Sequence, residues 1–271
     1  MRPTDFRAFC DLAYEQAGIR LGEEKLALVS ARVGKRLRAL NLSSEGEYLE
    51  VLRRDTGGEL IEFLDVISTN FTSFFREPAH FDRLAADLGR RLAQGQQSFK
   101  LWCAASSSGE EPYTIALVLE ELFAGHGVDW RVLATDISTR VLGLARRGQY
   151  RAPQLKAVRR EALAQHFVKQ RGEGGDDDVY EVSAKLKQHL TFARLNLARP
   201  PFPMKGPFDA VLCRNVMIYF DAPIRQALVS EMERLVRPGG LVFVGHAETL
   251  SGLETGLEVV APSVYRRPGP P

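Results

Sequence analysis

KLWCAASSSGEEPY, at residues 100–113, is the stretch that decides the fold. It opens as a short apolar run, passes through small residues to Gly109, and then begins a helix in which Pro112 suits the first turn. Apolar residues recur at helical spacing as far as Leu122. Strand, tight turn and helix in this order predict the first crossover of a doubly wound α/β domain, whose ligand binds beyond the carboxyl end of the strand.

The acids that follow the first two predicted strands indicate the kind of ligand. A dinucleotide needs several glycines in this loop, but residues 104–109 contain one, and Glu110 and Glu111 would repel a phosphate. The second predicted strand, 132–136, ends in Asp136, 25 residues after Glu111 (136 − 111). An acid at that place holds a ribose diol in such sheets. Either acid alone could be a helix N-terminal or a solvated carboxylate. The pair favours S-adenosylmethionine, which has a ribose diol, a sulfonium and no phosphate.

The composition argues against several classes of protein. The 271 residues, 45% of them hydrophobic, can bury one large domain or two unequal ones, and a net charge of +2 offers no argument for nucleic-acid binding. Cys10, Cys103 and Cys213 lie at unrelated spacings, the last two within apolar runs, so we expect buried thiols and no metal site. No N-terminal apolar segment has the length of a signal peptide, and no apolar run approaches ~20 residues. We therefore expect a cytoplasmic protein without direct membrane insertion. We also expect a monomer.

The first 70 residues carry no strand pattern and are predicted to be helical. Residues 25–40 form one amphipathic helix, followed by a second at 45–54. The side of the first helix opposite its apolar stripe carries a basic face, defined by Arg32, Lys35, Arg36 and Arg38. This face is either a solvated surface or a docking surface for an acidic helix.

Residues 68–78 are too polar for a core strand and too aromatic for an idle linker. Asn70, Thr72 and Arg76 could line a site while the phenylalanines anchor the segment. The alternative is a domain junction held by those phenylalanines. An amphipathic helix at 80–92 then leads into the first strand.

The rest of the chain continues the α/β pattern with one interruption. Residues 151–191 depart from βα alternation, and the segments 167–168 and 179–182 could pair as a hairpin around a flexible acidic turn. This predicts an insertion or a small β subdomain. Further strands are expected at 192–197, from 208 to the edge at Arg214 and Asn215, at 241–244, and twice within 256–267, with helices at 138–147 and 224–236.

Together these stretches resemble the chemotaxis receptor methyltransferases (the CheR family), which transfer methyl groups from S-adenosylmethionine to receptor glutamates. The similar segments are residues 69–77, 104–113, 134–137, 208–221, 237–240 and 245–248. They cover nearly the whole chain in the right order. The resemblance implies a Rossmann-like S-adenosylmethionine-dependent methyltransferase sheet at 71–271, a helical receptor-docking domain at 1–70, and an inserted β subdomain at about 167–192.

The resemblance also implies a set of site residues. The cofactor-binding positions are Asn70, Thr72, Arg76, Glu111, Asp136, Asn196, Leu197, Arg214 and Asn215. Arg76 and Tyr219 would face the transferred methyl group, although Tyr219 could also be a core aromatic residue. The basic face would dock glutamate-rich receptor helices. In some family members the β subdomain binds a pentapeptide at the end of the receptor tail, and the loop at 172–178 leaves that open here.

The chemistry of such a reaction needs no general base. A glutamate side chain is ionised at pH 7, so catalysis reduces to aligning its oxygen with the methyl carbon and the sulfur. Arg76 could hold the carboxylate in a bidentate pair and Tyr219 could orient it. S-adenosylhomocysteine would be the second product.

Three competing functions predict different features. A methyltransferase acting on nitrogen or hydroxyl acceptors would need a base that the sequence does not place there. An NAD-dependent enzyme is disfavoured by the single glycine of the loop at residues 104–109. A non-enzymatic signalling scaffold would have no need of Arg76, Glu111, Asp136 and Tyr219, all of which are present.

Overall fold

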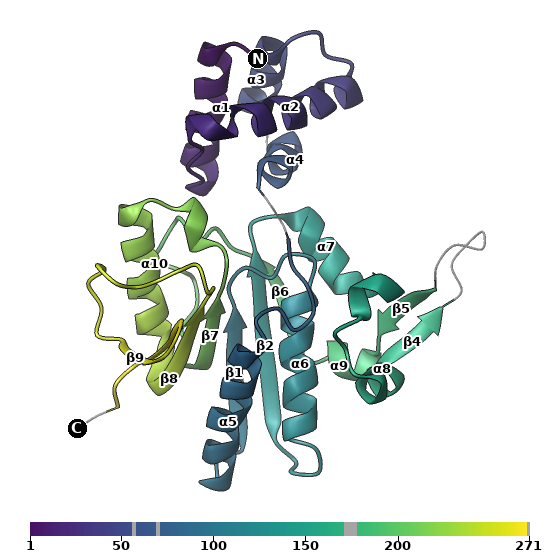
Figure 1. Ribbon diagram of the computed structural model, residues 1–271, viewed down its shortest axis with the longest axis vertical. Coiled ribbons are helices and arrows are strands. Elements are labelled where there is room, and N and C mark those ends of the chain that lie inside the picture. Colours follow the sequence, from purple (N-terminus) through teal and green to yellow (C-terminus); the bar gives the residue numbers. More distant parts are fainter. Residues whose placement is uncertain (56–57, 69–70, 171–177, 270–271) are drawn as a thin grey trace.

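The computed structural model describes residues 1–55, 58–68, 71–170 and 178–269. Four helices form a helical domain, drawn in purple and blue at the top of Figure 1. They are α1 (Pro3–Ala17), α2 (Leu26–Leu40), α3 (Glu45–Arg54) and α4 (Gly58–Ile67). The rings of Phe9, Tyr48 and Phe63 meet at the centre of this domain and are fully buried. The two helices predicted at 25–40 and 45–54 are confirmed as α2 and α3.

The larger domain is built on a seven-stranded sheet in the order β6-β2-β1-β7-β8-β10-β9. The strands are β1 (Ser98–Cys103), β2 (Asp129–Asp136), β6 (Leu190–Arg194), β7 (Phe208–Cys213), β8 (Val236–Val244), β9 (Glu258–Ala261) and β10 (Val264–Arg266). The first five are mutually parallel, and β10 runs antiparallel to β8 and β9. The helices α5 (Ala79–Ala93), α6 (Glu110–Leu122), α7 (Thr139–Arg147) and α10 (Ala222–Leu235) connect or precede these strands. The predicted Rossmann-like fold with a helical N-terminal domain is confirmed.

Both faces of this sheet are covered. Leu101 and Cys103 of β1 belong to one apolar layer, and Trp102 belongs to the other. This alternation follows from the two-residue period of a strand. The chain runs outward from β1 through β2 to β6, and then returns to β7 on the other side of β1. The carboxyl ends of β1 and β7 therefore flank a topological switch point, where sheets of this kind bind ligands.

A small sheet in the order β3-β5-β4 is inserted after α7. Its strands are β3 (Gln149–Arg151), β4 (Phe167–Gln170) and β5 (Val179–Val182), accompanied by the short helices α8 (Arg160–His166) and α9 (Ala184–Lys187). The predicted hairpin is confirmed, since β4 pairs with β5 in antiparallel register. The insertion differs from the expected range of 167–192, because it begins with β3 while the residues from Leu190 onward already belong to the large sheet.

Polar contacts join the helical domain to the carboxyl edge of the large sheet. Arg140 of α7 forms an ion pair with Asp65 of α4 at 2.6 Å, and the backbone N–H of Arg20 donates to the carbonyl of Tyr219 at 2.9 Å. These contacts place the helical domain over the switch point. Within the described part of the chain, the helices are too short or too polar to cross a bilayer.

Candidate functional site

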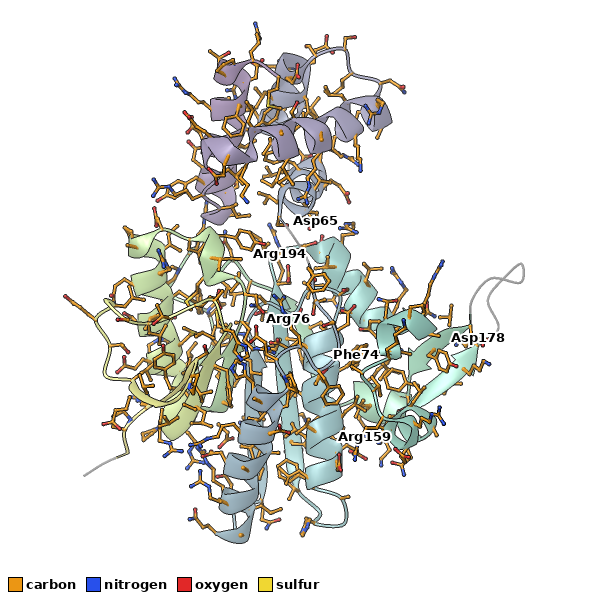
Figure 2. The ribbon with its side chains drawn as sticks, in the orientation of Figure 1. Asp65, Phe74, Arg76, Arg159, Asp178 and Arg194 are labelled. Atoms are coloured by element: carbon orange, nitrogen blue, oxygen red, sulfur yellow. The ribbon has the colours of Figure 1, made fainter. Side chains whose placement is uncertain are left out.

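A cleft lies between the carboxyl edge of the large sheet and the helical domain. Its empty volume, which includes space open to solvent, is about 890 Å³. Figure 2 shows Asp65 of the helical domain above Arg76 of the larger domain, and both residues line this cleft. The other lining residues are Ala17, Ile19, Ser68, Phe71, Thr72, Ala104, Ala105, Ser107, Glu111, Asp136, Ile137, Ser138, Leu195, Asn196, Leu197, Arg214, Asn215, Val216, Tyr219 and Phe220.

The loop after β1 is shaped by one glycine. Gly109 has a φ of +102°, and a Cβ there would lie 2.7 Å from the Tyr150 hydroxyl and 2.9 Å from the Ala145 Cβ. A larger residue would therefore meet both a strained backbone conformation and a clash. The turn at Gly109 starts α6 at once, and this places Glu111 in the first helical turn, beside the cleft.

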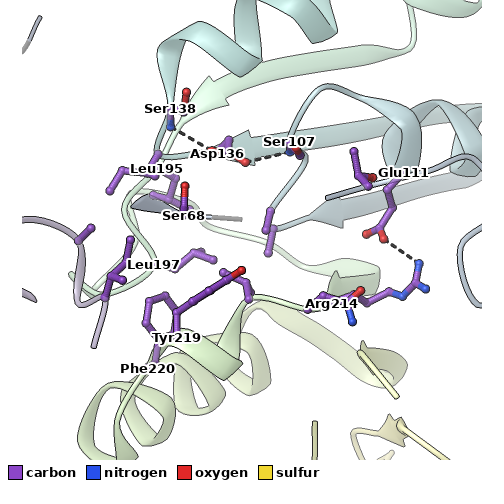
Figure 3. Close-up of a pocket in the computed structure, with 18 of the residues that line it drawn as sticks. Ser68, Ser107, Glu111, Asp136, Ser138, Leu195, Leu197, Arg214, Tyr219 and Phe220 are labelled. Carbon is purple, nitrogen blue, oxygen red and sulfur yellow. Dashed lines mark hydrogen bonds and ion pairs between the residues drawn. The ribbon is translucent and has the colours of Figure 1, made fainter. Parts of the chain in front are cut away.

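Glu111 is buried and paired with Arg214. The carboxylate Oε2 accepts from Arg214 at 2.7 Å (Figure 3). Its other oxygen, Oε1, accepts from the Cys103 thiol at 3.3 Å. Burial raises the pKa of Glu111, and the Arg214 charge opposes that shift. The Arg214 side chain is itself fully buried. Breaking such a pair from one side is strongly destabilising, so this pair holds the ends of β7 and α6 together.

Asp136 stands at the end of β2, as predicted. The backbone N–H of Ser107 donates to Oδ2 at 2.9 Å, and that of Ser138 donates to Oδ1 at 3.0 Å (Figure 3). Burial raises the pKa of Asp136, while these backbone donors lower it. Each carboxylate oxygen can accept further hydrogen bonds, so the group can still receive a pair of hydroxyls.

Arg76 and Tyr219 line the same cleft from different segments. The Arg76 guanidinium donates to the carbonyl of Phe71 at 2.9 Å and lies 5.5 Å from the centroid of that ring. Tyr219 ends a 3-10 turn, Met217–Tyr219, after β7 and is half-buried. The two residues expected to act in the chemistry therefore line one cleft, although 143 positions separate them (219 − 76).

The structure adds supporting residues that the sequence did not single out. Glu77 accepts from Arg214 at 2.9 Å. Glu248 accepts from the backbone N–H groups of Asn215 at 2.8 Å and Gly245 at 2.6 Å. These carboxylates hold the β7 and β8 loops in position. The only signal in the sequence was their place within the segments that resemble the family.

Asn196 and Leu197, predicted to lie at the end of the third strand, have different surroundings. Leu197 is buried and lines the cleft. The Asn196 side chain donates to the Gln16 carbonyl of α1 at 2.8 Å and accepts from the N–H of Ala198 at 3.0 Å. This amide thus joins the two domains. Thr72 lines the cleft as expected, and Asn70 lies outside the described residues.

Half of the predicted basic face has partners within the helical domain. Arg36 forms a bidentate pair with Glu59 of α4, with distances of 2.9 and 2.6 Å. Arg32 donates to the carbonyls of Val66 and Ser68 at the end of the same helix. These partners are in reach because α4 packs against this side of α2, and receptor docking by the basic face stays a prediction. Two members of the face, at positions 35 and 38, are exposed.

Comparison with known proteins identifies the family. Residues 70–265 match the model of the CheR methyltransferase, SAM binding domain, and residues 4–68 match the CheR methyltransferase, all-alpha domain. The chain belongs to the CheR methyltransferase family. It is therefore an S-adenosylmethionine-dependent methyltransferase of chemotaxis, and the predicted cofactor and enzyme class are confirmed.

Several relatives match this CheR chain over almost all of its length. The chemotaxis protein methyltransferase of Escherichia coli is 40% identical over 261 residues, which cover 96% of this chain and 89% of the relative. Chemotaxis protein methyltransferase 2 of Pseudomonas aeruginosa is 38% identical, with coverage of 96% and 92%. Among solved structures, TrmN from Thermus thermophilus is 18% identical, with coverage of 67% and 48% and a TM-score of 0.39.

Proposed function

We propose that this CheR family member methylates the side-chain carboxylates of glutamates in the cytoplasmic helices of chemoreceptors. The observation that supports this most directly is the lack of a free base at the site. No histidine lines the cleft among the described residues, and the carboxylates of Glu111, Asp136 and Asp65 are held by Arg214, by backbone N–H groups and by Arg140. An acceptor that carries its own negative charge fits such a site.

The residues present fit S-adenosylmethionine. Asp136 offers carboxylate oxygens for a ribose diol, and Glu111 offers a second carboxylate in the same cleft. Neither group suits a phosphate. When bound, the cofactor supplies a methyl group on a positively charged sulfur.

The chain's own residues would position the acceptor. The Arg76 guanidinium is planar and presents paired donors that match a carboxylate. It would neutralise the incoming glutamate as that group leaves water, and the Tyr219 hydroxyl would orient it by a hydrogen bond. The glutamate is ionised above about pH 4.3. Positioning of this kind can supply several kcal/mol of the barrier.

Receptor docking would use the exposed part of the helical domain. Lys35 and Arg38 present positive charge on α2, next to the cleft-lining α4, and receptor helices rich in glutamate would complement it. A receptor tail peptide could add a second contact by pairing with β4, which is an edge strand of the small sheet. In this proposal the protein acts as a monomer in the cytoplasm.

The test is transfer of labelled methyl groups from S-adenosylmethionine to purified receptor cytoplasmic fragments. A methyl ester releases its label as methanol in mild base, whereas a methylated nitrogen does not. We expect base-labile label at glutamates, located by mass spectrometry of receptor peptides. Base-stable label, or label on the receptor at residues other than glutamate, would overturn the proposed acceptor.

A further inference from the structure

Three side chains with metal-binding atoms meet behind the cleft. They are Glu77 just before α5, His80 in the first turn of α5, and His246 after β8, and one ligand atom of each lies within 4.8 Å of the others. None of them lines the cleft. Glu77 and His246 are 169 positions apart, so their spacing forms no motif. Glu77 and His80 are three positions apart in the sequence, whereas His246 reaches them only through the fold.

His80 lacks a hydrogen-bond partner of good geometry. Its side chain is 2% exposed, and neither ring nitrogen makes a hydrogen bond, although Glu77 Oε2 lies 3.4 Å from Nδ1 and the Pro262 carbonyl is also near the ring. The ring of His246 stands edge-on to it, with centroids 4.8 Å apart. Buried polar groups are almost always satisfied, so these weak contacts leave room for a better partner of the His80 ring.

A proton is a poor candidate for that partner. Burial and the charge of Arg214 lower the pKa of His80 to about 4, so its ring is neutral at pH 7. Burial would raise the pKa of Glu77, but the hydrogen bond and charge of Arg214 outweigh it and lower that pKa. Metal ions bind to the carboxylate form of a glutamate and to the neutral form of a histidine.

We propose that Glu77, His80 and His246 form a binding site for a divalent transition-metal ion such as Zn²⁺. Two imidazoles and one carboxylate are a known ligand set for zinc, whereas Mg²⁺ and Ca²⁺ prefer oxygen ligands. In a tetrahedral site with bonds of about 2.0–2.1 Å, neighbouring ligand atoms lie about 3.3 Å apart. The distance from His80 Nδ1 to Glu77 Oε2 is 3.4 Å, and that from His246 Nε2 to the same oxygen is 3.9 Å.

The surroundings support this geometry. The His246 side chain is 54% exposed, which gives an ion a path from solvent and leaves the ring room to turn toward the other ligands. Arg214 donates to Glu77 Oε2 at 2.9 Å and acts as the outer hydrogen bond that fixes a ligating carboxylate. A bound ion would join the segment that follows Arg76 to the loop after β8, and so stabilise the fold.

The test uses protein without a histidine tag, stripped of metal and titrated with Zn²⁺ against a chromophoric chelator. We expect one Zn²⁺ per chain and a melting temperature that rises with Zn²⁺ concentration. His246→Ala should weaken binding by about tenfold or more. His126→Ala, at an exposed histidine in the turn after α6, is the matched control and should bind as the native protein does.

X-ray absorption at the zinc edge reports which atoms bind the ion, and a general loss of stability would not change that result. Two imidazole ligands are expected in the native protein and one in His246→Ala. Equal affinity in the native protein and His246→Ala would overturn the proposal. So would the lack of stoichiometric binding, or an all-oxygen coordination shell.

Discussion

Replacing Asp136 should weaken cofactor binding, and the structure sets a range for the size of the effect. The carboxylate lies at the end of β2 and receives backbone N–H groups of Ser107 and Ser138, one on each oxygen. A ribose diol would add hydrogen bonds to the same charged group. Leaving the buried ribose hydroxyls without this acceptor costs about 1–3 kcal/mol of binding free energy. Asp136→Ala should therefore weaken binding of S-adenosylhomocysteine by about 5- to 150-fold.

The same substitution also affects the fold, and the two effects can be separated. Loss of the acceptor leaves the N–H groups of Ser107 and Ser138 unsatisfied, while removal of a buried charge relieves its desolvation. The change in unfolding free energy should thus be smaller than the change in binding free energy. Calorimetry with S-adenosylhomocysteine measures the affinity, and denaturant unfolding measures the stability. Asp129→Asn, at an exposed position where β2 begins, is the matched control. Unchanged affinity in a well-folded Asp136→Ala protein would refute a role for Asp136 in binding.

Four further outcomes are expected. Arg76→Lys keeps the charge but loses the planar fork, so turnover should fall by about tenfold or more. Tyr219→Phe should also lower turnover, without changing cofactor affinity. Reversing Lys35 and Arg38 to Glu should reduce receptor methylation while cofactor affinity stays constant, and added salt should reduce the native activity in the same way, since exposed charges are screened within about 8–10 Å. Because burial raises the pKa of Asp136, protonation begins at a higher pH than in a free aspartate. Cofactor affinity should then fall as the solution is acidified through that raised pKa.

Each of these outcomes has a measurement that can contradict it. Single-turnover methylation should show the Arg76 and Tyr219 defects in the chemical step, and normal rates there would remove both residues from the mechanism. Native methylation rates in the doubly reversed variant would show that this surface is merely solvated. For Asp136, affinity that stays constant down to the acid unfolding transition would exclude its carboxylate as a ligand group.

The pKa shift of Asp136 should make the free energy of unfolding and the cofactor affinity depend on pH in opposite directions. A carboxyl group whose pKa is higher in the folded than in the unfolded state favours folding most at low pH, where it is protonated in both states. At higher pH its contribution to the free energy of unfolding is smaller. Its charged form is disfavoured by burial, so that contribution is lost as the pH rises through the raised pKa. Acidification should therefore reduce cofactor affinity without this group weakening the fold.

Residues close together in the sequence determined the strand, turn and helix on which the site is built. A strand, a glycine turn and a helix in succession specify a crossover, because apolar periodicity reports which residues a strand or helix buries. Gly109, Glu111 and Asp136 follow from that arrangement, since the carboxyl ends of parallel strands meet at one edge of a sheet. Those parts of the cleft could be predicted from residues close together in the chain.

The remaining features depend on contacts between distant segments. The pairing of Arg36 with Glu59 needs the packing of α2 on α4, and the amide of Asn196 meets α1 only after the two domains have come together. Likewise, the group of Glu77, His80 and His246 exists only because α5 and the β8 loop lie side by side. Sequence periodicity shows that a polar residue avoids the apolar core, but it does not show which charge or carbonyl the residue then meets. That partner is decided by the order of the strands and the docking of the domains.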